Sequence, residues 1–191
     1  MAGIKGSKTE QNLLKAFAGE SQARNRYTYF ASAAAKEGYE QIAAIFQETA
    51  DNEKEHAKRF FKFLEGGPLE ITATYPAGKI SDTLENLKEA AAGENEEHTV
   101  LYPGFGDVAK KEGFAEAADA FYNIAKVEVE HEKRYRKLIE NIEKNQVFKK
   151  TQPVRWKCRN CGYVHEGTEA PDKCPSCLHA KKFFEIKETN Y

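Results

Sequence analysis

Long apolar runs are missing from this sequence, since no segment approaches the roughly 20 consecutive apolar residues that span a bilayer. The first residues, MAGIKGSKTEQN, also lack the apolar stretch of a secretory signal peptide. A strong excess of charge of one sign is absent, because 29 basic and 30 acidic residues leave a net charge of -1. We therefore expect a cytoplasmic protein that has neither a membrane nor a nucleic acid as its partner.

Cysteine is scarce and confined to one stretch. All four cysteines lie between Cys158 and Cys177, and the preceding part of the chain has none. In an intracellular protein such a cluster favours a metal site, so two local disulfide bonds are the weaker alternative. At 191 residues the chain can form one sizeable domain and a small appendage that holds these cysteines.

Apolar residues recur at helical spacing in four long stretches. The first stretch begins with Ser7 and Glu10 in the spacing of a capping box, and the third begins with Asp82 and Glu85 in the same spacing. Pro103 and neighbouring glycines in the third stretch predict a kink or bulge in its middle. The predicted helices cover residues 7–37, 39–66, 82–112 and 114–144.

Residues 66–81 lack helical spacing and contain Pro68, Pro76 and Gly78, so we expect an extended connection there. A helix of about 27 residues is roughly 40 Å long, and an extended segment of about 16 residues reaches about 50 Å. The connection can therefore run the length of the second helix, which makes helices two and three parallel. This is the one-crossover topology of ferritin-like bundles. We predict an all-α four-helix bundle at residues 1–148 and a small β-rich metal domain at 153–191.

An internal repeat relates the two halves of the helical part. Ala-Gly-Glu ends at Glu20 and again at Glu94, and Lys-Glu-Gly comes directly before Tyr39 and before Phe114. Each of these two aromatic residues is followed 17 positions later by a histidine. The two histidines are therefore equivalent under the repeat.

The second half of the repeat is one residue longer than the first. The glutamate and the Lys-Glu-Gly motif are 16 positions apart in the first half and 17 in the second. Because Tyr27 pairs with Tyr102, the insertion lies between Glu94 and Tyr102. A single extra residue in a helix is most simply absorbed as a π-bulge, which is enriched at functional sites. Glu97, whose counterpart is Ala23, is thus the carboxylate that the repeat does not supply.

Two Glu-x-x-His motifs, Glu53 with His56 and Glu128 with His131, occupy the equivalent positions of the repeat. Residues three apart share one helical face, so each pair can reach one point. One glutamate on each of the other two helices completes the set, namely Glu20 and Glu94. Four helices arranged in this way can enclose two metal ions, and oxygen and nitrogen donors suit iron or manganese.

Other polar residues need separate interpretation. Glu-x-x-Glu pairs are common in this chain and by themselves indicate solvated helix faces. His98 falls on another helical face than Glu97, so we do not expect it to be a ligand. Tyr27 and Tyr102 are candidates for hydroxyls that hydrogen-bond to ligating carboxylates, with plain core packing as the alternative.

The cysteines form two pairs, Cys158 with Cys161 and Cys174 with Cys177, each separated by two residues. This is a strong pattern for four thiolates around one metal ion. Tetrahedral sulfur selects zinc or iron. The spacing leaves open both a structural zinc ribbon and a redox-active iron centre.

Together these features resemble the rubrerythrin family, in which a ferritin-like di-iron bundle is fused to a C-terminal rubredoxin-like domain. The segments AFAGESQARNRY at 16–27 and CRNCGYVHEGT at 158–168 are similar to that family almost residue for residue. The resemblance implies a single iron, or zinc, held by Cys158, Cys161, Cys174 and Cys177. It implies a di-iron site held by Glu20, Glu53, His56, Glu94, Glu97, Glu128 and His131.

The resemblance implies a peroxidase that reduces hydrogen peroxide to water in oxidative stress defence. Electrons would come from NAD(P)H through partner reductases, rubredoxin-type carriers and the thiolate iron. It also implies a homodimer in which the rubredoxin-like domain of one subunit lies near the di-iron site of the other. A ferroxidase or iron-handling protein is the main alternative, and a binding protein with a zinc tail and a structural bundle site is the second.

Charge gives Glu97 a specific role in this interpretation. Two ferrous ions carry a charge of +4, which the four other glutamates neutralise, whereas two ferric ions carry +6 and favour a further anion. Glu97 can supply that charge, and neutral His56 suits the reduced state, so we expect the two to exchange at one iron. The expected catalytic residues are therefore Glu97, His56, Tyr27 and Tyr102.

Overall fold

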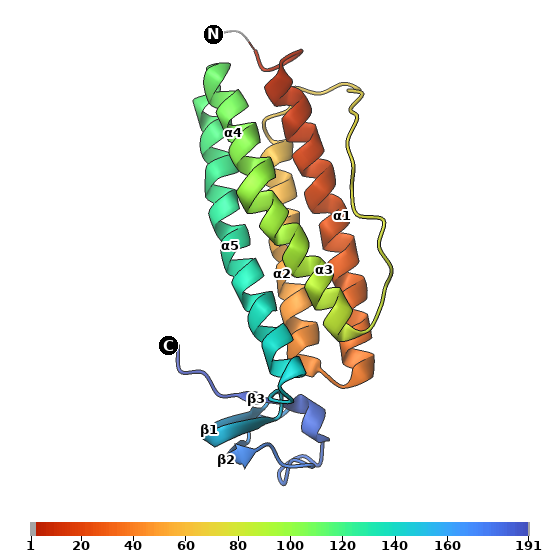
Figure 1. The fold of residues 1–191 in the computed structure, drawn as a ribbon, viewed down its shortest axis with the longest axis vertical. Coiled ribbons are helices and arrows are strands. Elements are labelled where there is room, and N and C mark those ends of the chain that lie inside the picture. Colours follow the sequence, from red (N-terminus) through yellow and green to blue (C-terminus); the bar gives the residue numbers. More distant parts are fainter. Residues whose placement is uncertain (1–2, 191) are drawn as a thin grey trace.

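Four helical columns and a small sheet make up the computed structural model, which describes residues 3–190 (Figure 1). The bundle contains α1 (Lys8–Glu37), α2 (Glu40–Phe61), α3 (Thr83–Glu96), the π-helical η1 (Glu97–Leu101), α4 (Tyr102–Lys111) and α5 (Ala115–Glu143). The tail contains β1 (Lys149–Cys158), β2 (Val164–Glu169), the 3-10 turn η2 (Lys181–Phe183) and β3 (Phe184–Ile186). The predicted all-α bundle and β-containing tail are confirmed. Among the described helices, none is both long and apolar enough to cross a membrane.

The first and third columns begin at the predicted capping residues. Ser7 Oγ accepts a hydrogen bond from the N–H of Glu10 at 3.0 Å, and the Glu10 carboxylate accepts one from the N–H that precedes Ser7. Asp82 Oδ1 likewise accepts a hydrogen bond from the N–H of Glu85 at 2.9 Å. Gly38 ends α1 with a left-handed φ of 89°, which lets the chain turn directly into α2.

The segment between α2 and α3 runs outside the bundle, alongside α1, and brings the chain back to the opposite end (Figure 1). Residues 64–82 have neither helix nor strand. Tyr75 fixes the segment to α1 by donating a hydrogen bond from its hydroxyl to the carbonyl of Lys15 at 2.8 Å. Because the chain restarts at the other end, α2 and α3 run parallel, as the one-crossover prediction requires.

The third column changes its hydrogen-bond spacing at η1. There the N–H of Tyr102 bonds to the carbonyl of Glu97, five residues back, so this turn is wider than an α-helical turn. The predicted π-bulge is confirmed at the place where the repeat has its extra residue. Pro103 lies in the first turn of α4, where a missing N–H is tolerated.

Two aromatic clusters fill the bundle on either side of its middle, and the repeat relates one to the other. In equivalent order they consist of Tyr27, Phe46 and Tyr135 at one end, and Tyr102, Phe121 and Phe60 at the other. Ring centroids within each cluster are 4.9 to 6.1 Å apart, and all six rings are buried. The clusters therefore exclude water from the middle of the bundle on both sides.

The tail forms an antiparallel sheet in the order β2-β1-β3 around buried Trp156. Strand β1 begins at Lys149, earlier than the strand start that the sequence predicts near Pro153, because Lys149 still pairs with Glu169. The register of this pairing shifts between Lys149 and Val154. Pro153, which has no N–H to donate, lies inside that irregular stretch.

The tail contacts the bundle at the end where α1 turns into α2. Lys182 Nζ lies 2.7 Å from Glu40 Oε1, and the rings of Tyr39 and Phe148 stack with centroids 6.2 Å apart. The small sheet of the tail therefore lies beyond this end of the bundle (Figure 1).

Glu112, at the end of the third column, holds the start of α1. Its carboxylate accepts hydrogen bonds from the hydroxyl of Thr9 at 2.6 Å and from the N–H groups of Thr9 and Lys8 at 2.8 and 3.1 Å. The Thr9 hydroxyl, together with these N–H groups, lowers the pKa of Glu112. The carboxylate thus satisfies donors that α1 leaves unpaired at its first turn.

We expect Glu112→Gln to lower the free energy of unfolding at neutral pH by about 0.5 to 1 kcal/mol, a small effect because the side chain is exposed. Since the folded-state pKa is lowered, the contribution of Glu112 is complete above the ordinary value of 4.5 and disappears as pH falls through the folded-state pKa. Urea unfolding of the parent, the variant and the exposed-site control Glu70→Gln, between about pH 2 and 7, measures this. A parent-to-variant difference that stays constant over that range would contradict it.

Candidate metal centres

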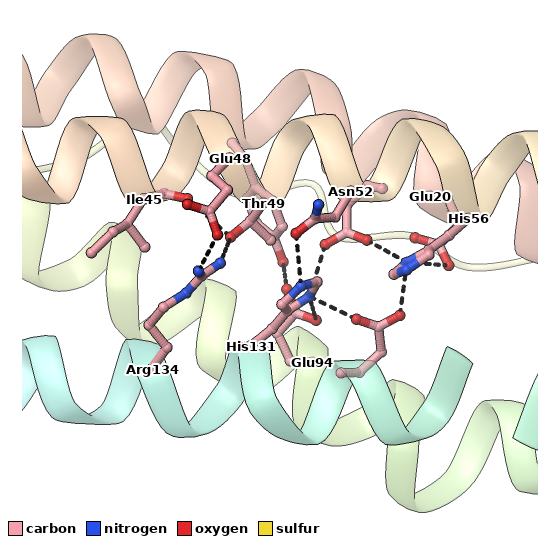
Figure 2. Close-up of polar contacts among 12 residues, drawn as sticks. Glu20, Ile45, Glu48, Thr49, Asn52, His56, Glu94, His131 and Arg134 are labelled. Carbon is pink, nitrogen blue, oxygen red and sulfur yellow. Dashed lines mark hydrogen bonds and ion pairs between the residues drawn. The ribbon is translucent and has the colours of Figure 1, made fainter. Parts of the chain in front are cut away.

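Carboxylates and imidazoles from all four columns meet inside the bundle (Figure 2). One candidate metal-binding group contains Glu20, Glu53, His56 and Glu128, and the other contains Glu53, Glu94, Glu128 and His131. In each group the donor atoms lie within 4.8 Å of one another. Glu53 and Glu128 belong to both groups, so two ion positions would share two carboxylates.

Each histidine directs its Nδ1 atom into this centre. His56 Nδ1 lies 2.8 Å from Glu53 Oε2 and 3.0 Å from Glu128 Oε1. His131 Nδ1 lies 3.3 Å from Glu53 Oε1 and 2.8 Å from Glu128 Oε2. Each shared glutamate therefore offers one oxygen to the side of His56 and the other oxygen to the side of His131, which is the arrangement of a bridging carboxylate.

The converging atoms lack hydrogen-bond partners within the described part of the chain. They are both carboxylate oxygens of Glu53 and Glu128, one oxygen each of Glu20 and Glu94, and Nδ1 of His56 and His131. The short approaches of the two Nδ1 atoms are thus ion-pair distances without hydrogen-bond geometry. A buried polar atom without a partner costs about 1 to 3 kcal/mol, whereas a shared cation satisfies several such atoms at once. These residues fit a pair of metal ions, and their oxygen and nitrogen atoms suit iron or manganese.

The pKa values show that the centre attracts positive charge. Burial raises the pKa of Glu94 to about 8, and burial together with the carboxylates around it raises that of Glu20 well above its usual range. Burial lowers the pKa of His56 and of His131, but Glu128 and Glu53 outweigh it and raise the two values to about 10 and about 12. Burial also opposes ionisation of Glu128, yet the two histidines lower its pKa to about 2. Protons and metal cations therefore compete for the same atoms.

The two tyrosines hydrogen-bond to the centre crosswise between the halves of the repeat. Tyr27 donates from its hydroxyl to Glu94 Oε1, and Tyr102 donates to Glu20 Oε1, each at 2.5 Å. Burial raises the pKa of both tyrosines well above the usual value, so both hydroxyls keep their protons and remain donors. Each hydroxyl occupies one carboxylate oxygen, and the other oxygen of that carboxylate is buried without a hydrogen-bond partner among the described residues.

Glu97 belongs to neither group. It lies half-buried in η1, and burial, followed by the carboxylates of Glu94 and Glu128, raises its pKa well above the usual value. Its side chain lines a cavity of about 330 Å³ between α1, the crossover segment and η1. Tyr102 lines the same cavity, so the cavity reaches the edge of the centre. The role of Glu97 as a ligand stays a prediction from the sequence.

The sequence patterns did not indicate two polar residues beside the centre, Asn52 and Glu132. Asn52 Oδ1 lies 3.3 Å from His131 Nε2 (Figure 2). Glu132 is buried, and its Oε2 lies 2.6 Å from His98 Nε2. The repeat could have indicated Asn52, because the equivalent residue in the second half is the aliphatic Val127.

All four cysteine sulfurs lie together in the tail. Cys158 Sγ is 3.8 Å from Cys177 Sγ, and Cys161 Sγ is 3.6 Å from Cys174 Sγ. A tetrahedron of sulfurs about 2.3 Å from a central ion has edges of about 3.8 Å, so these distances fit one four-thiolate metal ion. Cys158 and Cys174 are buried, whereas Cys161 is exposed at the surface of the domain.

Comparisons with known proteins cover both centres. The family model described as Rubrerythrin matches residues 11–139, and the model described as Rubrerythrin, rubredoxin-like domain, matches residues 156–185. A rubrerythrin of Porphyromonas gingivalis is 63% identical over 188 residues, which cover 98% of this chain and 94% of that protein. A rubrerythrin of Nitratidesulfovibrio vulgaris is 56% identical over 191 residues, which cover 100% of both chains.

A solved structure agrees with these matches. It is described as the fully reduced state of nigerythrin, all ferrous, and superposes with a TM-score of 0.64 at 33% sequence identity. The superposition covers 97% of this chain and 92% of that chain. The bundle and the cysteine tail are thus found together in one chain of that protein as well.

We expect metal to stabilise the bundle, because bound cations satisfy the unpaired buried atoms of the centre. Addition of Mn²⁺ to metal-free protein at about 1,000 times its dissociation constant should stabilise the fold by about 4 kcal/mol per site, and a chelator should reverse this. Calorimetry of parent and Glu53→Gln measures it, with Glu130→Gln as the control because Glu130 is exposed and forms an ion pair with Lys133 at the surface. Equal metal-induced shifts in the melting temperature of parent and Glu53→Gln would contradict a site at these residues.

Proposed function

The chain belongs to the rubrerythrin family, and we propose that it is a cytoplasmic non-haem di-iron peroxidase that reduces hydrogen peroxide to water in oxidative stress defence. The two centres of the family, a di-iron carboxylate site and a four-cysteine rubredoxin-like site, are both present in this chain. The observation that carries the proposal is the pair of overlapping groups that share Glu53 and Glu128. Two ions held by shared carboxylates lie close enough to act together on one small molecule. The four cysteines of the tail form a metal-binding group instead of disulfide bonds, which suits the reducing cytoplasm.

The proposed ligands follow from the converging side chains and from the charge argument for Glu97. Residues 1–148 form the proposed di-iron domain and residues 153–191 the proposed rubredoxin-like domain. The di-iron ligands are Glu20, Glu53, His56, Glu94, Glu97, Glu128 and His131. The ligands of the single iron, for which zinc is the alternative, are Cys158, Cys161, Cys174 and Cys177.

Protein residues bring the substrate and its protons to the centre. A diferrous pair supplies the two electrons that hydrogen peroxide needs, and two protons complete its conversion to two water molecules. The cavity lined by Glu97 and Tyr102 offers a route from the surface, and its volume of about 330 Å³ is ample for so small a substrate. Glu97 and Tyr102 face that route with groups that can pass protons, while Tyr27 holds Glu94 in place.

The charge of the centre supports an exchange of Glu97 for His56 at one iron on reduction. Four glutamates balance two ferrous ions, and a fifth suits two ferric ions. In this structure His56 Nδ1 lies within a candidate group and Glu97 lies outside both, which is the arrangement with less negative charge. We expect crystal structures of the oxidised and the chemically reduced protein to differ at these two residues, and identical ligands in both would contradict the exchange.

With an iron held by Cys158, Cys161, Cys174 and Cys177, this centre would pass electrons to the di-iron site, and they would come from NAD(P)H through a reductase or a rubredoxin. The tail touches its own bundle at Glu40, and the centre begins at Glu53 on the same helix. At 1.5 Å per residue this separation is about 20 Å along the axis, which is long for a direct electron transfer. We therefore propose a homodimer in which the partner subunit supplies the nearer rubredoxin-like domain.

The test compares two oxidants on the diferrous protein. We expect hydrogen peroxide to oxidise it at least 10-fold faster than oxygen does at equal concentration, as followed by stopped-flow absorbance. A faster reaction with oxygen would replace the peroxidase by the ferroxidase or iron-handling alternative. Metal analysis of the same sample should give three irons per chain, and zinc in the tail would remove the electron relay.

Cys174→Ser serves as the control that separates the two centres. This variant should keep the single-turnover reaction of the bundle with hydrogen peroxide. It should lose steady-state turnover with NAD(P)H and a reductase, because the relay is broken. Unchanged steady-state turnover after loss of the thiolate-iron colour would show that electrons bypass the tail.

A further inference from the structure

The repeat that pairs the two Glu-x-x-His motifs also pairs Asn52 with Val127. Each residue comes directly before the glutamate of its own motif. The second motif lies 75 positions after the first, as His131 lies 75 positions after His56. Next to the centre, the repeat therefore has a polar amide in one half and an aliphatic side chain at the equivalent position of the other half. The difference lies on α2 and α5, the two columns that carry the histidines.

Asn52 lies across from the histidine of the opposite helix. Its Oδ1 atom is 3.3 Å from His131 Nε2, on the edge of the ring that faces away from the carboxylates (Figure 2). Asn52, Val127 and His131 line one shallow surface cavity. Because the repeat exchanges α2 and α5, Val127 is the residue in the corresponding position relative to His56. An isopropyl group cannot accept the hydrogen bond that the amide accepts.

The two histidines are therefore held differently. With Nδ1 of His131 directed at the carboxylates, its Nε2 carries the proton and donates to the amide carbonyl of Asn52. The polar contacts of His56 within residues 3–190 are all made by Nδ1, so its Nε2 has no hydrogen-bond partner there. The side chain of His56 is also 12% exposed, against 5% for His131. Histidines that bind metals generally need such a partner to fix the ring and its tautomer.

We propose that Asn52 is the positioning residue that fixes His131 as a permanent metal ligand, and that Val127 leaves His56 free to move because it offers no equivalent bond. This inference rests on the di-iron site and the ligand exchange proposed above, and it deepens them. It states why the exchange occurs at the ion position of His56 and not at that of His131. Glu97 acts at the same position in the proposed exchange, since it shares its cavity with Tyr102, which hydrogen-bonds to Glu20, a member of the group with His56.

Three substitutions separate this role from an ordinary surface position. Asn52→Val removes the acceptor and makes the two halves alike. Asn52→Asp keeps an oxygen acceptor at the same place and controls for the change of side chain. Val127→Asn places an amide at the position that the repeat relates to Asn52, and this site is 38% exposed, so it can accept a polar side chain.

The first measurement uses Zn²⁺, which is diamagnetic and redox-inert, on the full chain with the four-cysteine site filled first. Nitrogen-15 NMR of the histidine rings should show slow exchange of the Nε2 proton with water for His131 and fast exchange for His56. Asn52→Val should lose the slow signal and weaken Zn²⁺ binding in the bundle by about 10- to 100-fold. Asn52→Asp should retain both properties, and Val127→Asn should gain a second slow signal from His56.

The proposal is overturned if Asn52→Val leaves the His131 proton slow, or if Asn52→Asp loses as much Zn²⁺ affinity as Asn52→Val. It is also overturned if His56 still leaves its iron in crystals of oxidised Val127→Asn. Expected NMR and Zn²⁺ results in a protein that reacts faster with oxygen than with peroxide would reject the proposed function and keep the role of Asn52. A protein that reacts faster with peroxide than with oxygen, but that fails the NMR and Zn²⁺ tests, would keep the proposed peroxidase function and reject the role of Asn52.

Discussion

The fold depends on one unfavourable arrangement, the burial of several carboxylates at one place between two layers of aromatic rings. Like charges in a water-free interior repel one another, and unpaired lone pairs there are costly. The bundle meets this by holding the groups on four packed helices and by donating tyrosine hydroxyls from opposite halves, Tyr27 to Glu94 and Tyr102 to Glu20. The buried oxygen and nitrogen atoms that still lack hydrogen-bond partners are the atoms that can bind metal ions.

A repeat gives two equivalent halves, and function requires them to differ. Two identical halves would hold two equivalent ions with identical ligands. The chain departs from equivalence at η1, where Glu97 has no counterpart, and at Asn52, whose counterpart is Val127. Tyr135 and Phe60 differ by a hydroxyl within otherwise equivalent aromatic clusters. Each departure adds a polar group to one half only, so the two ion positions become chemically distinct.

The helices, the crossover and the π turn could be predicted because their signals are local or periodic. Capping residues, helical spacing and a one-residue mismatch in the repeat are all readable without coordinates. The acceptor role of Asn52 was not readable, because a lone amide has no periodicity and its partner His131 lies on another helix. The place of Glu97 outside both groups depends on a side-chain direction that the wide turn sets. The early start of β1 reflects a pairing of Lys149 across an irregular register, which no local pattern reveals.

The wide turn η1 is fixed on both sides, by the bond of Tyr27 to Glu94 before it and by the bond of Tyr102 to Glu20 after it. The few residues between these anchors include one more than an α-helix would need. The backbone there can change shape while both anchors keep their positions. A change in the position of Glu97 can thereby be absorbed within one turn, without displacing the anchored rings of Tyr27 and Tyr102.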